Sequence, residues 1–178
     1  MRIFARAQIV ALMMASWLPL PAAAEGLGRI TAYLAGEAEE WHTITMEQGG
    51  RKVATASFEQ GARLTELRVQ GHPEPRFTTR DVFSVDVRFE GPFAPGAEPL
   101  SVDVMHVPEG MGGPFWTSRG AAKPARIDIV ELEVYGSYGR LVATFEAELC
   151  FRPIISSATD TGNCRPVTGV IETEIAVE

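Results

Sequence analysis

Residues 138–150 read YGRLVATFEAELC, and this stretch decides the fold. Its apolar side chains recur at every second position, while polar side chains fill most of the positions between them. The recurring set is Leu141, Ala143, Phe145, Ala147 and Leu149. A period of two sends alternate side chains to opposite faces of a β-strand, so one face is predicted to be buried and the other wet. The runs 83–89 and 171–177 alternate in the same way.

Weaker strand patterns cover most of the remaining chain after residue 28. They are the runs 29–35, 40–46, 52–58, 64–70, 101–107 and 125–135. Segments rich in Gly and Pro separate them, as expected for turns. No dozen-residue window beyond the N-terminal segment has the 3.6-residue period of an amphipathic helix, and a parallel sheet would need crossover helices. The sequence therefore predicts an all-β fold, an antiparallel β-sandwich or flattened barrel of about nine strands.

The segment Gly-Ser-Tyr-Gly at residues 136–139, which overlaps the start of this stretch, predicts a hairpin turn. If Tyr135 pairs with Arg140, the apolar stripes of the two strands face each other. Ile127 and Ile129 would then fall on the wet face, and a β-bulge beside Val130 would turn them inward. The predicted core consists of apolar residues from the alternating runs: Ile30, Leu34, Phe83, Val85, Val87, Phe89, Val102, Val104, Val130, Leu132, Phe145, Leu149, Ile171 and Ile175.

The N-terminus has the pattern of a bacterial signal peptide. Arg2 and Arg6 form a positive segment, residues 7–20 are uncharged and mostly apolar, and Ala22 to Ala24 supply small residues for cleavage. The apolar run is too short to cross about 30 Å of hydrocarbon comfortably, which disfavours a membrane anchor. We therefore expect a signal peptide at residues 1–24 and one β domain at residues 25–178.

The charge of the mature domain limits its partners. Cleavage would remove two Arg and no acid, leaving 14 Lys and Arg against 23 Asp and Glu, a formal charge of −9. Nucleic acids and anionic lipid surfaces are bound through basic faces, so neither is expected as a partner. No later segment is long and apolar enough to span a membrane. The expected location is periplasmic or extracellular.

Two cysteines are present, Cys150 and Cys164. Export would place them in an oxidising compartment, where pairing is the default. Their spacing fits neither a C-x-x-C redox motif nor a zinc knuckle. A structural disulfide is predicted, worth about 3 kcal/mol for a loop of this length.

Two short stretches resemble small secreted or periplasmic β-rich bacterial proteins of unknown function. They are the run Gly28 to Leu34, followed by Gly36, Glu37 and Trp41, and the run Gly139 to Ala147. The resemblance implies a periplasmic, β-sandwich-like domain. It transfers no catalytic or ligand-binding residue.

Catalytic motifs are weak in this chain. Asp160-Thr161-Gly162 matches an aspartic protease triplet, but that chemistry needs two paired carboxylates and an apolar strand before the triplet, so a turn is the better interpretation. His42, His72 and His106 could act as bases, and an enzyme or metal protein would need two of them, or one and a carboxylate, to converge. No catalytic residue and no cofactor is assigned, and the sequence favours a protein that is not an enzyme.

Two sets of side chains suit metal ions, and no metal site is assigned to either. The soft ligands Met105, His106 and Met111, with Trp116 nearby, suit copper. The alternative is that the methionines pack and His106 faces solvent. Six glutamates on the predicted strands carry the charge and the oxygen ligands that suit calcium. Calcium ligands usually come from loops, so a solvated strand face is the favoured interpretation. These positions are Glu131, Glu133, Glu146, Glu148, Glu172 and Glu174.

Apolar side chains in Gly- and Pro-rich segments are the candidate binding residues: Phe93, Met111, Phe115 and Trp116. Loops on a β scaffold commonly carry recognition sites, although for Phe115 and Trp116 the start of a short core strand is the favoured interpretation. The leading hypothesis is a non-catalytic exported module that binds a protein partner. The alternatives are a carrier with a cavity for a small apolar ligand and, third, a metal protein or enzyme.

Overall fold

The computed structural model describes residues 24–178, which form eleven β-strands and no helix, and hence no helix able to cross a membrane. The strands are β1 (Glu25–Leu34), β2 (Glu37–Gln48), β3 (Arg51–Ala54), β4 (Ala56–Gln60), β5 (Leu64–Gly71), β6 (Val82–Glu90), β7 (Ser101–Val107), β8 (Phe115–Thr117), β9 (Arg126–Tyr135), β10 (Tyr138–Arg152) and β11 (Asp160–Val177). The prediction of an all-β fold is confirmed.

All eleven strands belong to one large sheet. Its order is β3-β2-β1-β11-β4-β5-β6-β7-β8-β10-β9, and β10 also pairs with β11. The pairings are antiparallel, except that β11 and β4 run parallel where Ala176 and Val177 meet Ser57 and Phe58. Hydrogen bonding therefore passes from the N-terminal strands through the C-terminal strand to the middle of the chain.

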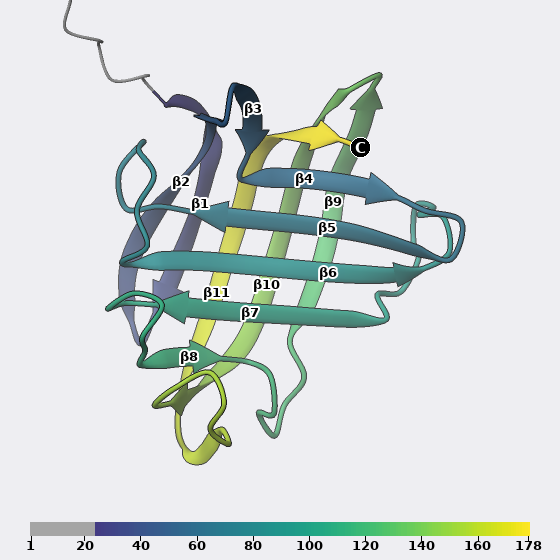
Figure 1. The fold of residues 1–178 in the computed structure, drawn as a ribbon. Coiled ribbons are helices and arrows are strands. Elements are labelled where there is room, and N and C mark those ends of the chain that lie inside the picture. The colour runs from purple at the N-terminus through teal and green to yellow at the C-terminus, as the bar shows by residue number, and fades with distance from the viewer. Residues whose placement is uncertain (1–23) are drawn as a thin grey trace, which may run out of the picture.

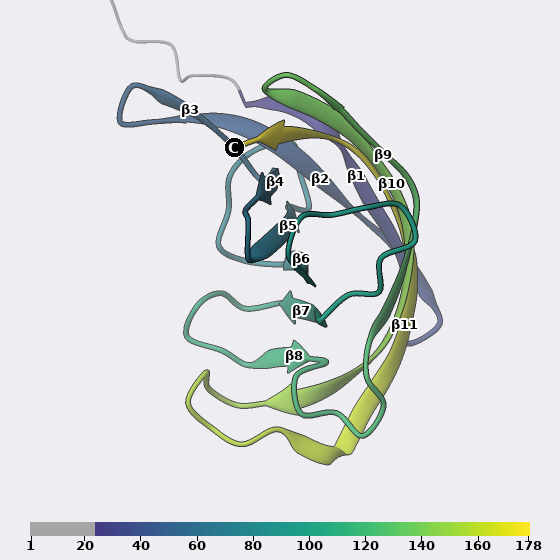
Figure 2. The ribbon, with the colours of Figure 1, turned by 90° about the vertical axis from the view of Figure 1, so that its right-hand side faces the viewer.

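The sheet bends over so that two groups of strands face each other. Strands β4 to β8 run across in front of β1, β2, β9, β10 and β11, and the second group curves round behind the first (Figures 1 and 2). The inward side chains of both groups form one core, in which the rings of Phe83 on β6 and Phe145 on β10 lie 5.7 Å apart. Alternating sequence patterns on both groups supply the apolar faces that meet here.

The predicted strand 52–58 is divided at Thr55, where the chain passes from one group of strands to the other. The Thr55 N–H donates to the Ile44 carbonyl at 2.8 Å, and the Thr55 hydroxyl accepts from the Ile44 N–H at 2.9 Å. The Thr55 carbonyl accepts from the Gln70 N–H at 2.7 Å. These bonds satisfy the backbone at the corner, which a continuous strand pattern cannot reveal.

The β9–β10 hairpin contains the predicted bulge but in a different register. Tyr135 pairs with Tyr138 rather than Arg140, a shift of two residues that keeps the side chains from Glu131 to Tyr135 on their expected faces. The register breaks between Glu131 and Ile129, so Ile129 turns inward and Val130 becomes the bulged residue. Val130 is 64% exposed, and its placement in the predicted core was wrong. Of that core, Val102 and Leu132 are half-buried and the rest are buried.

The predicted signal peptide and its cleavage after Ala24 fall almost wholly outside the described residues. They stay predictions.

Candidate functional site

A cluster of polar side chains lies between the two groups of strands. His106 on β7 donates from Nε2 to Asp81 Oδ1 at 2.7 Å, and Trp41 Nε1 on β2 donates to the same oxygen at 3.2 Å. Arg165 Nη2 on β11 donates to His106 Nδ1 at 2.8 Å. The Arg165 guanidinium also lies 4.1 Å from the ring centre of Trp116. One hydrogen-bonded chain therefore links β2, β7, β11 and the residue before β6.

Local backbone structure orients each side chain of this hydrogen-bonded cluster. Asp81 has φ of 52°, a left-handed conformation that Asp tolerates better than most residues, and β6 begins directly after it. His106 is buried on the inward face of β7, with its ring 5.6 Å from that of Trp41. Arg165 pairs with the buried Leu149 across β10, so it points inward as well.

The hydrogen bonds fix the tautomer of His106. Arginine can only donate, so Nδ1 must accept and the proton resides on Nε2, facing Asp81. Burial lowers the pKa of His106; the Asp81 carboxylate opposes this effect, and the nearby positive charge of Arg165 adds to it. A protonated ring would turn an N–H toward the Arg165 donor. Burial and the positive charge of Arg165 therefore favour the neutral form of His106, against the opposing effect of Asp81.

This geometry meets the condition that a histidine and a carboxylate converge, but it leaves the imidazole no free nitrogen. A general base needs an open lone pair directed at substrate, and both ring nitrogens are engaged. The carboxylates of Glu39 and Asp81 lie within metal-binding reach of His106. A cation on Nε2 would require a protonated Nδ1 or an acceptor beside it, whereas Arg165 is a donor there. The cluster fits a structural role better than catalysis or metal binding.

The other two histidines meet through their backbones. The His42 N–H donates to the His72 carbonyl at 2.6 Å, and the His72 N–H donates to the His42 carbonyl at 2.9 Å. This isolated bridge joins β2 to the residue after β5. His72 is fully buried, and burial lowers its pKa. The pair connects the two groups of strands at one corner.

The residues considered for copper are not brought together. Met105 lies on the opposite face of β7 from His106 and packs against Val82, Val107 and Phe115. Met111 lies in the loop before β8 and is 73% exposed.

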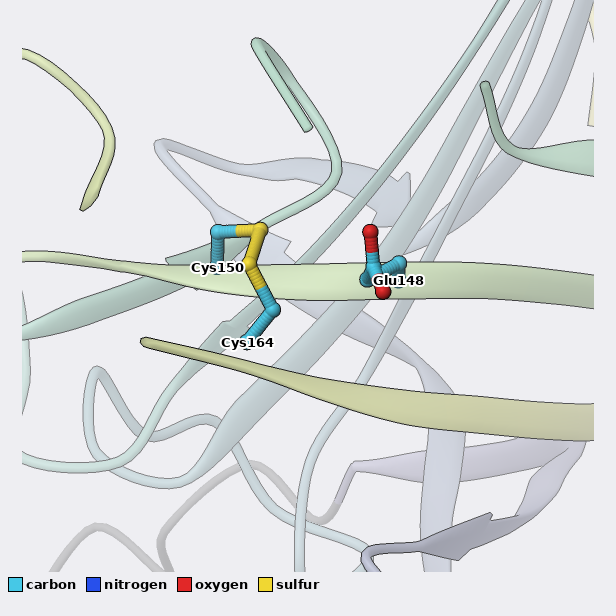
Figure 3. Close-up of side chains that lie close together, drawn as sticks. All are labelled: Glu148, Cys150 and Cys164. Carbon is cyan, nitrogen blue, oxygen red and sulfur yellow. A yellow bond between two sulfur atoms is a disulfide. The ribbon is translucent and has the colours of Figure 1, made fainter. Parts of the chain in front are cut away.

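The predicted disulfide is present. Cys150 on β10 and Cys164 on β11 are directly opposite each other in the ladder and are bonded (Figure 3). Glu148 lies close to both sulfur atoms, but cysteines joined in a disulfide carry no thiolate to bind a metal ion. The bridge holds the two strands together at the start of the loop 153–159.

The four predicted binding residues occupy different environments. Phe115 is buried, and Trp116 is half-buried beneath Arg165. Phe93 is half-buried in the loop 91–100 between β6 and β7, where it contacts the rings of Phe58 and Phe89. Met111 is exposed in the loop 108–114 between β7 and β8. These two loops adjoin opposite ends of β7, so Phe93 and Met111 do not share one surface.

A groove lies between the Phe93 loop and β9. It encloses about 450 Å³, a volume within the usual range for ligand sites, and is lined by residues of both segments. Figure 2 shows the loop between β6 and β7 reaching across toward the strands behind it. Phe89, Phe93, Ile127, Ile129 and Leu132 supply its apolar surface. The sequence signals Phe93, but the opposing strand is more than 25 residues further along and carries no local motif.

One wall of this groove is an open sheet edge. Among residues 24–178, β9 pairs only with β10 and ends the sheet order. An edge strand presents unpaired N–H and C=O groups along its free side. The same strand and loop carry four acids that line the groove, Glu98, Asp128, Glu131 and Glu133, and no lining residue is basic.

The chain matches no protein family model, no curated protein and no solved structure. The groove and the polar cluster must therefore be interpreted from their own chemistry.

Proposed function

We propose that this protein is a non-catalytic interaction module that binds a protein partner in the groove between the loop 91–100 and β9. The observation that carries the proposal is a groove, lined by both apolar and acidic residues, that runs beside an unpaired strand edge. Backbone groups on such an edge can pair with another chain, and the apolar floor can bury its side chains. Phe93, one of the four predicted binding residues, lies in this groove.

Fold and location are part of the same proposal. Two facing groups of strands that cross each other support an orthogonally packed β-sandwich or a flattened barrel formed from one sheet. We propose that residues 1–24 are removed and that the domain acts in the periplasm or outside the cell. The Cys150–Cys164 disulfide supports this location, since such bonds persist in oxidising compartments.

Site-specific photo-crosslinking in the source organism tests the function. A benzoylphenylalanine at Ala97, an exposed residue of the groove, should give an adduct of discrete mass in the exported fraction. The same group at Ala158, exposed in the loop 153–159, is the matched control and should give none. Phe93→Ala should reduce the Ala97 adduct several-fold, because it removes apolar contact area from the groove. Equal adducts from both positions, or none from Ala97, would refute the proposal.

A further inference from the structure

We infer that the partner supplies an extended segment in which apolar residues alternate with Lys or Arg, and that this segment adds to the free edge of β9 as a new strand. The inference rests on the proposed function and specifies the chemistry of its partner.

The free edge can accept a strand along the part nearest the hairpin. Tyr135 and Tyr138 close a two-residue turn, so they exchange hydrogen bonds with each other. In an antiparallel ladder the intervening residues direct their backbone groups to the other side. Leu132 and Val134 therefore point N–H and C=O groups away from β10. An incoming backbone would satisfy both residues.

Side-chain periodicity favours an alternating segment. Added strands send successive side chains to opposite faces of the sheet. On the inward side they meet the apolar surface formed by Phe93, Ile129 and Leu132, and on the outward side they meet the acidic side chains of β9. Apolar residues at every second position of the partner thus fit the groove.

The charge of the groove indicates which residues of the partner segment alternate with its apolar residues. Four acidic residues and no Lys or Arg line the groove, and of these acids only Glu131 has a basic partner among residues 24–178, Arg140 Nε at 2.9 Å. Lys or Arg on the incoming strand would lie opposite Asp128 and Glu133, and opposite charges directly across a strand pair stabilise it. A second copy of β9 would instead place carboxylates against carboxylates. The edge is therefore protected from self-pairing and open to a basic strand.

Peptide display on the intact protein tests this inference. The probe is an unbiased library of linear ten-residue peptides, and enriched sequences are synthesised for fluorescence anisotropy. We expect Lys or Arg alternating with apolar residues and an affinity that falls several-fold between low and high salt. The double reversal Glu98→Lys with Asp128→Lys should weaken binding about tenfold, whereas Glu47→Lys, at an exposed site on β2, should leave it unchanged.

A proline pair tests strand addition separately from charge. Val134→Pro removes one N–H from the free edge of β9, and its side chain is already 46% exposed. Lys52→Pro does the same on β3, the strand at the opposite end of the sheet order. We expect V134P to weaken peptide binding at least tenfold and K52P to change it less than twofold, with both variants melting cooperatively.

Several outcomes would overturn the inference. They are enriched peptides that are neutral or acidic, a V134P variant that binds normally, a library that yields no binder, or a concentration-dependent dimer that the double charge reversal abolishes. If the Ala97 crosslink persists in any of these cases, the groove is still a binding site and only the partner chemistry is wrong. If the crosslink is also absent, the proposed function fails with it.

Discussion

Replacement of His106 by phenylalanine would remove both hydrogen bonds at the centre of the polar cluster while keeping a planar ring. The ring contacts with Trp41 at 5.6 Å and Phe83 at 6.1 Å can be retained, so little packing is lost. The stability change should therefore report the hydrogen bonds rather than a cavity.

The two partners of His106 would be affected unequally. Asp81 has a 43% exposed side chain and keeps the bond from Trp41, so water can replace what it loses. Arg165 is half-buried and its Nε already has no hydrogen-bond partner among the described residues. Loss of the His106 acceptor removes a hydrogen bond from the Arg165 guanidinium. Hydrogen bonds to charged groups contribute about 1.5–3 kcal/mol to stability. We expect His106→Phe to cost about 2–3 kcal/mol of unfolding free energy.

A second substitution isolates the contribution of the arginine. Arg165→Met removes the charge but keeps an unbranched apolar chain that can still lie against Trp116. In the double variant no guanidinium is left without an acceptor, so its cost should be smaller than the sum of the single costs by about 1–2 kcal/mol. The measurement is urea unfolding at pH 7.5, followed by the fluorescence of Trp41 and Trp116, which both adjoin the cluster.

The lowered pKa of His106 also predicts how the stability of the protein depends on pH. Because the fold lowers the pKa of His106, the unfolded chain takes up a proton below about pH 6.5 that the folded chain does not. Stability should fall as pH drops below that value, and His106→Phe should make this decline shallower, with the buried His72 retaining part of it. Single costs that add within about 0.3 kcal/mol, or an unchanged pH slope, would refute the role given to His106.

Two further changes have defined outcomes. Replacing both Cys150 and Cys164 by Ala should lower the free energy of unfolding by about 3 kcal/mol, because the disulfide closes a loop with a sequence separation of 14. Urea unfolding of the variant and of the oxidised parent measures this difference. A cost below about 1 kcal/mol would contradict the entropic explanation. Asp86→Asn should stabilise the protein at pH 7 by about 0.5 kcal/mol and do so less at pH 3. Burial raises the pKa of Asp86, and it lies directly opposite Asp103, so its ionisation costs stability as pH rises above the ordinary value near 4. A destabilised variant at pH 7 would show that neighbouring arginines dominate.

The sequence was most informative where a local period decides the structure. Alternation predicts β10 and the inward faces of β6 and β11, and the misplaced Ile127 and Ile129 predict the bulge that the hairpin contains. The exact partner of Tyr135 was wrong because registers two residues apart bury the same stripe. Period alone cannot choose between them.

The candidate sites could not be predicted because they join distant segments. His106, Asp81 and Arg165 carry no shared motif, and their meeting depends on how the two groups of strands cross. The groove likewise needs the Phe93 loop to reach β9, which no alternating pattern encodes. Sequence composition indicates which side chains are available, while the sheet order decides which of them meet.

The position of β11 also affects when the protein can fold. This strand pairs with β1, β10 and β4, so the sheet order is continuous only after residues 160–177 are in place. A chain that emerges N-terminus first can form the local β1–β2 and β4–β5 pairs, but the second partner of β1 and of β4 is β11, whose pairing residues lie more than 100 residues later. Such distant pairings make folding slow. For a chain that we propose to be exported, this delay would keep it unfolded, and therefore able to pass through a narrow channel, until translocation is nearly complete.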